Sequence, residues 1–257
     1  MAFDVAAESY DSFMGRYSVL LAPGLADFAD VQPGQTALDV GCGPGALTTE
    51  LVRRLGPEAV AAVDPSEQFV EAARARHPGV DVRHAAAEEL PYPDGAFDVT
   101  LAQLVVHFMA DPVAGLGEMA RVTRPGGVVA ACVWDLAGER APISPFWHAA
   151  RELDPELKDE SKRPGARAGH LTELFEAAGL GDVEEATLTA AVEHPSFEDW
   201  WRPFTLGVGP AGAYAQSLGA AELAAVRERA RDVLSDGPFT LETVAWAARG
   251  TTPSADS

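Results

Sequence analysis

The stretch LDVGCGPG, residues 38–45, joins a short apolar segment to an amphipathic helical pattern, and it limits the possible folds more than any other part of the chain. Three glycines, Gly41, Gly43 and Gly45, stand where a strand would turn into a helix. Because glycine has no Cβ atom, such a turn lets a ligand approach the backbone closely. The spacing fits the broad GxGxx(G/A) fingerprint of nucleotide-binding βαβ units, which by itself allows more than one class of cofactor.

Short β-rich runs and helical patterns alternate through the middle of the chain. We expect strands at residues 36–41, 59–64, 80–85, 97–106 and 126–134. This alternation predicts right-handed βαβ crossovers and a parallel sheet with helices on both faces. Two later strand patterns, at residues 183–194 and 239–250, flank a helical and aromatic-rich stretch. They predict an antiparallel hairpin at the edge of the sheet, with a cap inserted between its arms.

The same patterns divide the chain into parts. We predict an N-terminal helical lid at residues 1–35, a Rossmann-like α/β core at 36–194, an inserted helical and aromatic cap at 195–236, a final core strand at 237–250 and a flexible tail at 251–257. The charged run KDESKRPGAR, residues 158–167, is interpreted as a solvated bend. With 47% apolar residues, a chain of 257 residues has ample material for a core.

Composition restricts the partners and the compartment. Asp and Glu total 39 against 19 Lys and Arg, which gives a net charge of −20. Because phosphate backbones bind through Lys and Arg, we expect no nucleic-acid partner. We expect no membrane span, because no apolar stretch approaches about 20 residues. Cys42 and Cys132 lack metal-ligand spacing, and the N-terminus does not have the pattern of a signal peptide, so we expect a cytoplasmic protein without a bound metal.

Two acids near the glycine loop restrict the cofactor. Asp64 ends the second expected strand, and an acid at this distance from the loop can accept hydrogen bonds from both ribose hydroxyls of an adenosine group. It could instead be a turn residue before Pro65. Asp39 would repel a pyrophosphate at close range and attract a cation, although it could also be a buried acid bonded to loop amides. A ligand with adenosine, positive charge and no phosphate is S-adenosylmethionine.

Four motifs now point to one family. LDVGCGPG, the acid in VDPSE, AEELPYPDGAFDV and RVTRPGGVV occur in this order over residues 36–134. Together they resemble the class I S-adenosylmethionine-dependent methyltransferases, in the branch similar to small-molecule and quinone methyltransferases. The resemblance implies a Rossmann-like, doubly wound sheet of seven strands that is mostly parallel, with one antiparallel strand. It is weaker outside these residues, although it includes YDSFMGRYS near the start.

The resemblance assigns roles at the methionine end of the cofactor. It implies that Asp39 and the glycines Gly41, Gly43 and Gly45 line this end. It also implies that Gln103, at the end of the fourth expected strand, offers its backbone carbonyl to the amino acid ammonium.

At the adenosine end, the resemblance implies that Asp64 holds the ribose and that Ser66 lies beside it. Ala87, through its backbone, and Glu88 are expected at the adenine. The chain departs from the family in the stretch HAAAEEL, where Ala86 replaces an acid that often binds the adenine amino group. Either Glu88 compensates, or backbone or water binds this group.

The N-terminal segment places Tyr10, Phe13 and Tyr17 on one face at helical spacing. This face could pack onto the core. Alternatively, the segment is a lid over the cofactor, in which an aromatic ring such as that of Tyr10 lies against the sulfonium. In that interpretation Arg16 binds the methionine carboxylate.

His107 is the best candidate for a general base, because it follows the fourth expected strand near the edge where ligands of such sheets bind. It could instead be a structural histidine, as His148 and His194 are expected to be. Trp200 and Trp201 lie in an aromatic-rich segment that could form the core of the cap, an apolar wall for the acceptor, or both.

We therefore predict an enzyme that transfers a methyl group from S-adenosylmethionine to O, N or C of a small, apolar molecule, leaving S-adenosylhomocysteine. Three alternatives remain at this point. They are a cyclase or isomerase that uses the same cofactor without methylating, an NAD(P)-dependent oxidoreductase, and a non-catalytic binding protein of the same fold. The sequence predicts neither the acceptor nor the oligomeric state.

Overall fold

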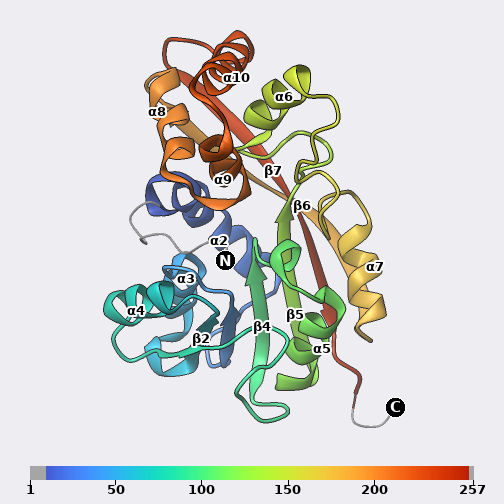
Figure 1. Cartoon of the computed structure of the whole chain (residues 1–257). Coiled ribbons are helices and arrows are strands. Elements are labelled where there is room, and N and C mark those ends of the chain that lie inside the picture. The colour runs from blue at the N-terminus through green and yellow to red at the C-terminus, as the bar shows by residue number, and fades with distance from the viewer. Residues whose placement is uncertain (1–9, 255–257) are drawn as a thin grey trace.

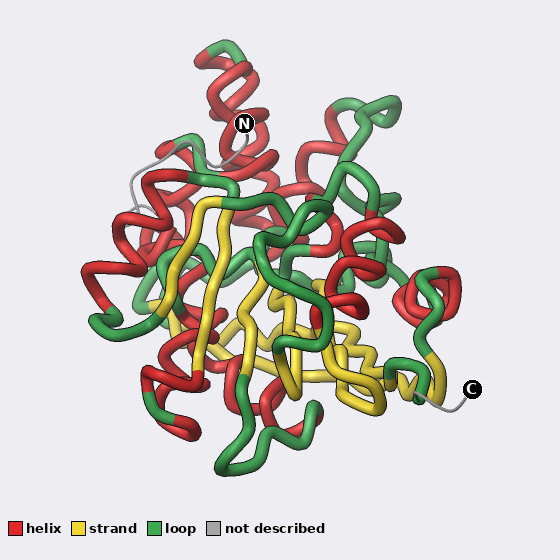
Figure 2. Tube along the Cα trace, turned by 90° about the horizontal axis from the view of Figure 1, so that it is seen from below, coloured by secondary structure: helices red, strands yellow, loops and turns green. Residues whose placement is uncertain are grey.

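The computed structural model describes residues 10–254, and these form one seven-stranded sheet with helices on both faces (Figure 1; Figure 2). The strands are β1 Ala37–Val40, β2 Val60–Asp64, β3 Asp81–His84, β4 Phe97–Gln103, β5 Thr123–Trp134, β6 Gly181–His194 and β7 Phe239–Thr251. Their order across the sheet is β3-β2-β1-β4-β5-β7-β6. Strand β7 is antiparallel to β5 and β6, whereas the other pairings are parallel. The predicted fold class is therefore confirmed.

The helices follow the alternation expected from the sequence and add several in the second half. The α-helices are α2 Arg16–Phe28, α3 Ala46–Leu55, α4 Glu67–Arg76, α5 Pro112–Val122, α6 Ser144–Leu153, α7 His170–Ala177, α8 Phe197–Trp201, α9 Gly209–Ser217 and α10 Ala220–Val233. Shorter turns are η1 Asp11–Gly15, η2 Pro57–Ala59, η3 Val106–Phe108 and η4 Arg202–Leu206.

The alternation of side chains along the strands explains how the sheet is covered. Ala37 packs in a cluster with the apolar residues of α2 and α3, whereas Leu38 and Val40 pack in a cluster with those of α5 and α7. Successive strand residues point to opposite faces, so the run ALDV supplies apolar side chains to both layers. Helix α5 begins after Asp111, whose side chain caps it by accepting a hydrogen bond from the Ala114 N–H at 3.0 Å.

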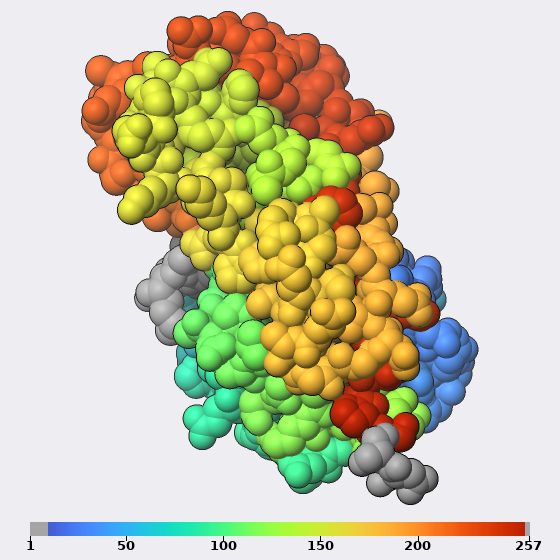
Figure 3. All heavy atoms as spheres, turned by 90° about the vertical axis from the view of Figure 1, so that its right-hand side faces the viewer, coloured from blue at the N-terminus to red at the C-terminus, as the bar shows by residue number. Residues whose placement is uncertain are grey.

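A cap covers one end of the sheet and consists of residues 135–166, which include α6, and residues 195–238, which include α8, α9 and α10. Aromatic rings join the two segments: Phe146 stacks on Phe204 at 4.7 Å, and Trp147 contacts Tyr214 at 5.4 Å between ring centroids. Figure 3 shows the two segments side by side at this end of the molecule. The predicted cap included only the second segment.

Most of the predicted N-terminal lid is part of the core of the protein. Leu21 and Leu25 of α2 are fully buried against the sheet, so α2 is a core helix. Residues 11–15, just before it, are the part that faces the cap through Phe13, whose ring meets that of Phe204 at 5.0 Å. Residues 1–9 of the predicted lid lie outside the described residues.

Two boundaries differ from the sequence expectation. Strand β4 ends at Gln103 and not at residue 106, because Leu104 has a left-handed φ of 61° that interrupts an extended strand. The predicted flexible tail begins too early, since Thr251 is the last residue of β7 and Thr252 is buried, with its Oγ1 donating to the Arg124 carbonyl at 2.6 Å. Residues 255–257 of that tail lie outside the described residues. Among the described residues, no helix is long and apolar enough to cross a membrane.

Candidate functional site

A cavity of about 500 Å³ lies between the carboxyl ends of the parallel strands and the cap. Its lower part is formed by the loops that follow β1, β2 and β4, which is where open α/β sheets bind ligands. Its upper part is formed by the cap and by residues of the N-terminal segment, including Phe13 and Met14. The cavity thus joins the predicted cofactor loop to the predicted acceptor region.

The glycine loop forms as predicted, and all three of its glycines have a positive φ. Gly41 has a φ of 71°, and a Cβ atom there would lie 2.5 Å from Val105 Cγ2. Gly45 has a φ of 98°, and a Cβ atom there would lie 2.6 Å from His77 Nε2. Both a left-handed conformation and a close neighbour therefore require glycine. Gly41 and Gly43 line the cavity, whereas Gly45 begins α3 behind them.

Asp64 lines the cavity beside this loop. Its Oδ2 accepts a hydrogen bond from the Gly43 N–H, and its Oδ1 accepts one from the Ser66 N–H, each at 2.8 Å. Burial raises the pKa of the Asp64 carboxyl, while these two N–H groups oppose that rise. The carboxylate is therefore held in one orientation and keeps unused lone pairs for a ligand. Ser66 also lines the cavity, next to Asp64.

Asp39 is buried beneath the loop, at 1% exposure, and does not line the cavity. Its Oδ2 accepts a hydrogen bond from Thr48 Oγ1 at 2.6 Å, whereas its Oδ1 has no partner among the described residues. Burial raises the pKa of this carboxyl to about 7, and the nearby charge of Asp64 adds to the rise. A positive ligand group near Asp39 would reverse this shift.

Gln103, on the adjacent strand β4, carries another acceptor without a hydrogen-bond partner among the described residues, in addition to Asp39 Oδ1. Its Nε2 donates to the Ser18 carbonyl at 3.0 Å, and its buried Oε1 has no partner among the described residues. Buried acceptors without partners are uncommon in folded proteins. Gln103 lines the cavity, so its side chain adds an acceptor without a partner to the backbone carbonyl named from the sequence.

The N-terminal segment contributes Tyr10, and Arg16 lies elsewhere. Tyr10 lines the cavity, and its ring meets that of Phe69 at 5.4 Å, while burial raises the pKa of its hydroxyl to about 12. Arg16 does not line the cavity, because its guanidinium donates to Asp199 Oδ2 at 2.7 Å and to the Glu193 carbonyl at 2.8 Å. The sequence-based prediction that Arg16 binds a carboxylate of the cofactor is thus not supported, since an acid of the cap occupies the guanidinium.

The two residues expected at the adenine make contacts within the protein instead. Glu88 Oε1 accepts hydrogen bonds from the Ala110 N–H at 2.7 Å and the Asp111 N–H at 3.2 Å, so it fixes the loop before α5. Ala87 is buried in the core cluster on the α5 side of the sheet. Neither residue lines the cavity. Other side chains line it near β2 and β3, and the sequence reasoning named none of them: Glu67, Gln68, Phe69 and His84.

His107 lines the cavity from η3 and is 4% exposed. Burial lowers the pKa of its imidazole to about 3, and the nearby Arg163 guanidinium contributes to the shift. Its Nδ1 is buried without a hydrogen-bond partner among the described residues, and its ring lies 3.9 Å from that of Phe108. The imidazole is therefore neutral at physiological pH.

The aromatic residues of the cap form its core and not the cavity wall. Trp200 and Trp201 are buried among Phe197 and Phe204, and none of the four lines the cavity. The wall is instead supplied by smaller or isolated apolar side chains that the sequence did not single out: Trp134, Leu136, Ile143, Val208 and Ala211. Two further wall residues, Leu104 and Val105, follow β4. The left-handed Leu104 has no sequence signal that would have identified it.

Comparisons with known proteins agree with this geometry. Residues 38–131 match a family model described as a methyltransferase domain. An uncharacterised methyltransferase from Mycobacterium sp. (strain JLS) is 33% identical over 178 residues, which cover 65% of this chain and 69% of that protein. Nocamycin O-methyltransferase from Saccharothrix syringae is 28% identical over 252 residues, which cover 96% of this chain and 79% of that protein.

Among solved structures, the YcgJ protein of Bacillus subtilis is similar with a TM-score of 0.59 and 18% identity, covering 91% of this chain and 98% of that one. At this identity the similarity concerns the fold alone. The chain spans about two thirds of the length of the first curated relatives that it matches.

Proposed function

Because the chain belongs to the class I S-adenosylmethionine-dependent methyltransferases, we propose that it transfers a methyl group from S-adenosylmethionine to an O, N or C atom of a small, apolar molecule in the cytoplasm. The observation that carries this proposal is the single cavity that extends from Asp64 and the glycine loop to the apolar side chains of Trp134, Ile143 and Val208. A cofactor at the loop and an acceptor under the cap would share that space.

The residues around the loop fit this cofactor. Gln103 lines the cavity, and its Oε1 is a buried acceptor without a partner among the described residues, to which an α-ammonium group would donate. Asp39 lies beneath the loop and would attract the same positive group through its charge. Asp64 would accept hydrogen bonds from the ribose hydroxyls, and Gly41 and Gly43 would admit the ligand to the backbone. When bound, S-adenosylmethionine supplies a methyl group activated by its sulfonium.

The chain contributes alignment and the exclusion of water. Phe13 and Met14 cover the cavity from the N-terminal side, and the apolar wall of the cap would orient the acceptor beside them. His107 is proposed to accept the proton of the acceptor. A pKa of about 3 keeps its imidazole neutral and able to accept, yet makes it a weak base. A base this weak takes up a proton readily only from a strongly acidic group, so the proposed role is restricted to an acceptor that carries one.

Calorimetry with S-adenosylmethionine, S-adenosylhomocysteine and NADH tests the first part of the proposal. We expect the first two to bind and NADH not to bind, because the cofactor end of the cavity is lined by the acids Asp64 and Glu67 and, among the described residues, by no lysine or arginine that could bind a pyrophosphate. Binding of NADH alone would contradict the proposal and favour an oxidoreductase.

Chromatography of reaction mixtures tests the second part. Incubation of S-adenosylmethionine with small amines and alcohols should yield S-adenosylhomocysteine together with a product heavier by one methylene. Conversion of the amine or alcohol without formation of S-adenosylhomocysteine would favour a cyclase or isomerase. If S-adenosylmethionine bound but no tested amine or alcohol were converted, a non-catalytic binding protein would be favoured.

A further inference from the structure

Glu160 lies at the cap end of the cavity, although it belongs to the charged run that the sequence suggests is a solvated bend. Its side chain is buried, at 3% exposure of the residue, and it lines the cavity. The interpretation of residues 158–167 as a solvated bend is therefore wrong for this position. Glu156, four residues earlier in the same loop, is exposed to solvent.

The carboxylate of Glu160 is held firmly but is not saturated. Its Oε2 accepts a hydrogen bond from Trp147 Nε1 at 3.0 Å, and its Oε1 lies 3.4 Å from Arg163 Nε. Arg163 also donates to the His107 carbonyl at 3.1 Å, which ties this loop to η3, the short turn that follows β4. A carboxylate offers about four lone-pair positions, so acceptor capacity remains for a ligand.

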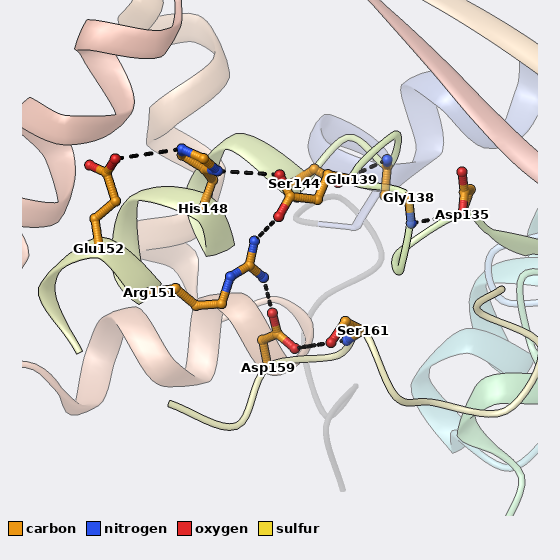
Figure 4. A network of polar contacts seen from close by, with 10 residues as sticks. Asp135, Gly138, Glu139, Ser144, His148, Arg151, Glu152, Asp159 and Ser161 are labelled. Carbon is orange, nitrogen blue, oxygen red and sulfur yellow. Dashed lines mark hydrogen bonds and ion pairs between the residues drawn. The ribbon is translucent and has the colours of Figure 1, made fainter. Parts of the chain in front are cut away.

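A polar network fixes the loop that carries Glu160. Figure 4 shows Arg151 of α6 between Glu139 and Asp159, which is the residue before Glu160. On its other side, Asp159 accepts a hydrogen bond from Ser161 Oγ at 2.6 Å. Because Asp159 is bonded on both sides, the next side chain has a defined direction in the cavity and is not a mobile surface acid.

The surroundings of Glu160 make this acid unusual. The neighbouring wall is apolar, through Leu136, Ile143 and Val208. Burial raises the pKa of the Glu160 carboxyl, with opposition from Trp147 and Arg163. No lysine or arginine is among the described residues that line the cavity, and the other carboxylates there, Asp64 and Glu67, come from β2 and α4 at the cofactor end.

We infer that Glu160 determines which acceptors bind, by accepting a hydrogen bond from a hydroxyl, amino or ammonium group of an otherwise apolar molecule. This inference rests on the proposed function, because it assigns the upper part of the same cavity to the methyl acceptor. A carboxylate or phosphate group on the acceptor would meet Glu160 without a cation in the cavity wall and would be rejected. His107 lines the same cavity, and its buried Nδ1 also has no hydrogen-bond partner among the described residues.

Three probes of matched length test this inference: 4-phenylbutylamine, 4-phenylbutanol and 4-phenylbutanoate. Each is titrated by calorimetry into protein saturated with S-adenosylhomocysteine. We expect the amine and the alcohol to bind at least about tenfold more tightly than the carboxylate. Equal affinities, tighter binding of the carboxylate, or binding of none of the three would overturn the inference. Failure of S-adenosylhomocysteine itself to bind would instead contradict the proposed function.

Variants separate recognition from support of the fold. Glu160→Gln keeps an acceptor for Trp147 and should weaken binding of the amine at least about tenfold, with unchanged affinity for S-adenosylhomocysteine. Glu156→Gln, in the same loop, should change neither affinity. Trp147→Phe removes the hydrogen bond to Glu160 but leaves the carboxylate, so the preference for the amine should persist. An unchanged preference in Glu160→Gln, or its loss in Trp147→Phe alone, would overturn the inference.

Discussion

The Gly43 N–H donates a hydrogen bond to Asp64 Oδ2 at 2.8 Å, which joins the glycine loop after β1 to the last residue of β2. The other oxygen of the same carboxylate is held by the Ser66 N–H. Two adjacent turns therefore fix the acid before any ligand binds. Such preorganisation reduces the conformational entropy that binding would otherwise cost.

Asp64→Ala should weaken binding of S-adenosylmethionine by roughly 100-fold, because the ribose would lose a charged acceptor and the Gly43 N–H would lose its partner. Calorimetry at constant pH measures the change. Glu58→Gln, which alters an exposed acid in the turn before β2, should leave the affinity unchanged. If the affinity of Asp64→Ala stayed within twofold of the wild type, Asp64 would not be a ribose ligand.

The core could be predicted from the sequence because its signals are local. The run ALDV, the three glycines and Asp64 lie within one βαβ unit, and each residue type matches the local backbone or neighbour that it meets. The parallel order of β1, β2 and β4 then follows from the alternation of strands and helices.

The cap and several side-chain roles could not be predicted, because they depend on contacts between distant segments. Nothing near α6 indicates that Phe146 will stack on Phe204. A long side chain such as that of Arg16 can reach many acids, and it pairs with Asp199, which is far away in sequence. In the sequence, Glu160 is not distinguishable from the other residues of its charged run, and only the folded structure shows that it is buried.

Arg16→Gln should lower the free energy of unfolding by about 1 kcal/mol and leave cofactor affinity within twofold. Arg16 and Asp199 are 29% and 33% exposed, so solvent screens their ion pair and the loss is modest. Urea denaturation and calorimetry measure the two effects. Asp199→Asn and the double variant complete a cycle, in which the two substitutions should be less than additive. A strong loss of affinity for the cofactor with unchanged stability would indicate that Arg16 does contact the cofactor.

Asp39→Asn should stabilise the ligand-free protein at high pH and weaken cofactor binding. The pKa of Asp39 is about 7 in the folded protein against 3.8 for the ordinary carboxyl, so the folded state holds the extra proton between these values. Stability supplied by that proton is lost as the pH rises from about 4 to about 7, and it changes no further above that range. Relative to the wild type, the variant should therefore gain roughly 2–3 kcal/mol between pH 5 and pH 8.

Urea denaturation across this pH range measures the gain for Asp39→Asn, with the wild type as the reference at each pH. A second consequence concerns binding. The cationic cofactor should favour the ionised carboxylate, so wild-type affinity should fall as the pH drops below 7, and the variant should lack that dependence. A constant difference in stability, or identical pH dependence of binding, would show that Asp39 is not the group that titrates.

His107→Gln should reduce the loss of stability at acidic pH. The pKa of His107 is about 3 in the folded protein against 6.5 for an ordinary imidazole, so between these values only the unfolded chain takes up the proton. Stability is therefore lost as the pH falls below about 6.5. Between pH 7 and pH 5 the variant should lose roughly 2 kcal/mol less than the wild type, as measured by urea denaturation. His148→Gln, on α6 outside the cavity, is measured alongside as the same substitution at an exposed histidine. Parallel curves for His107→Gln and the wild type would mean that the imidazole is readily protonated in the folded protein, and a base of ordinary strength would then face the acceptor.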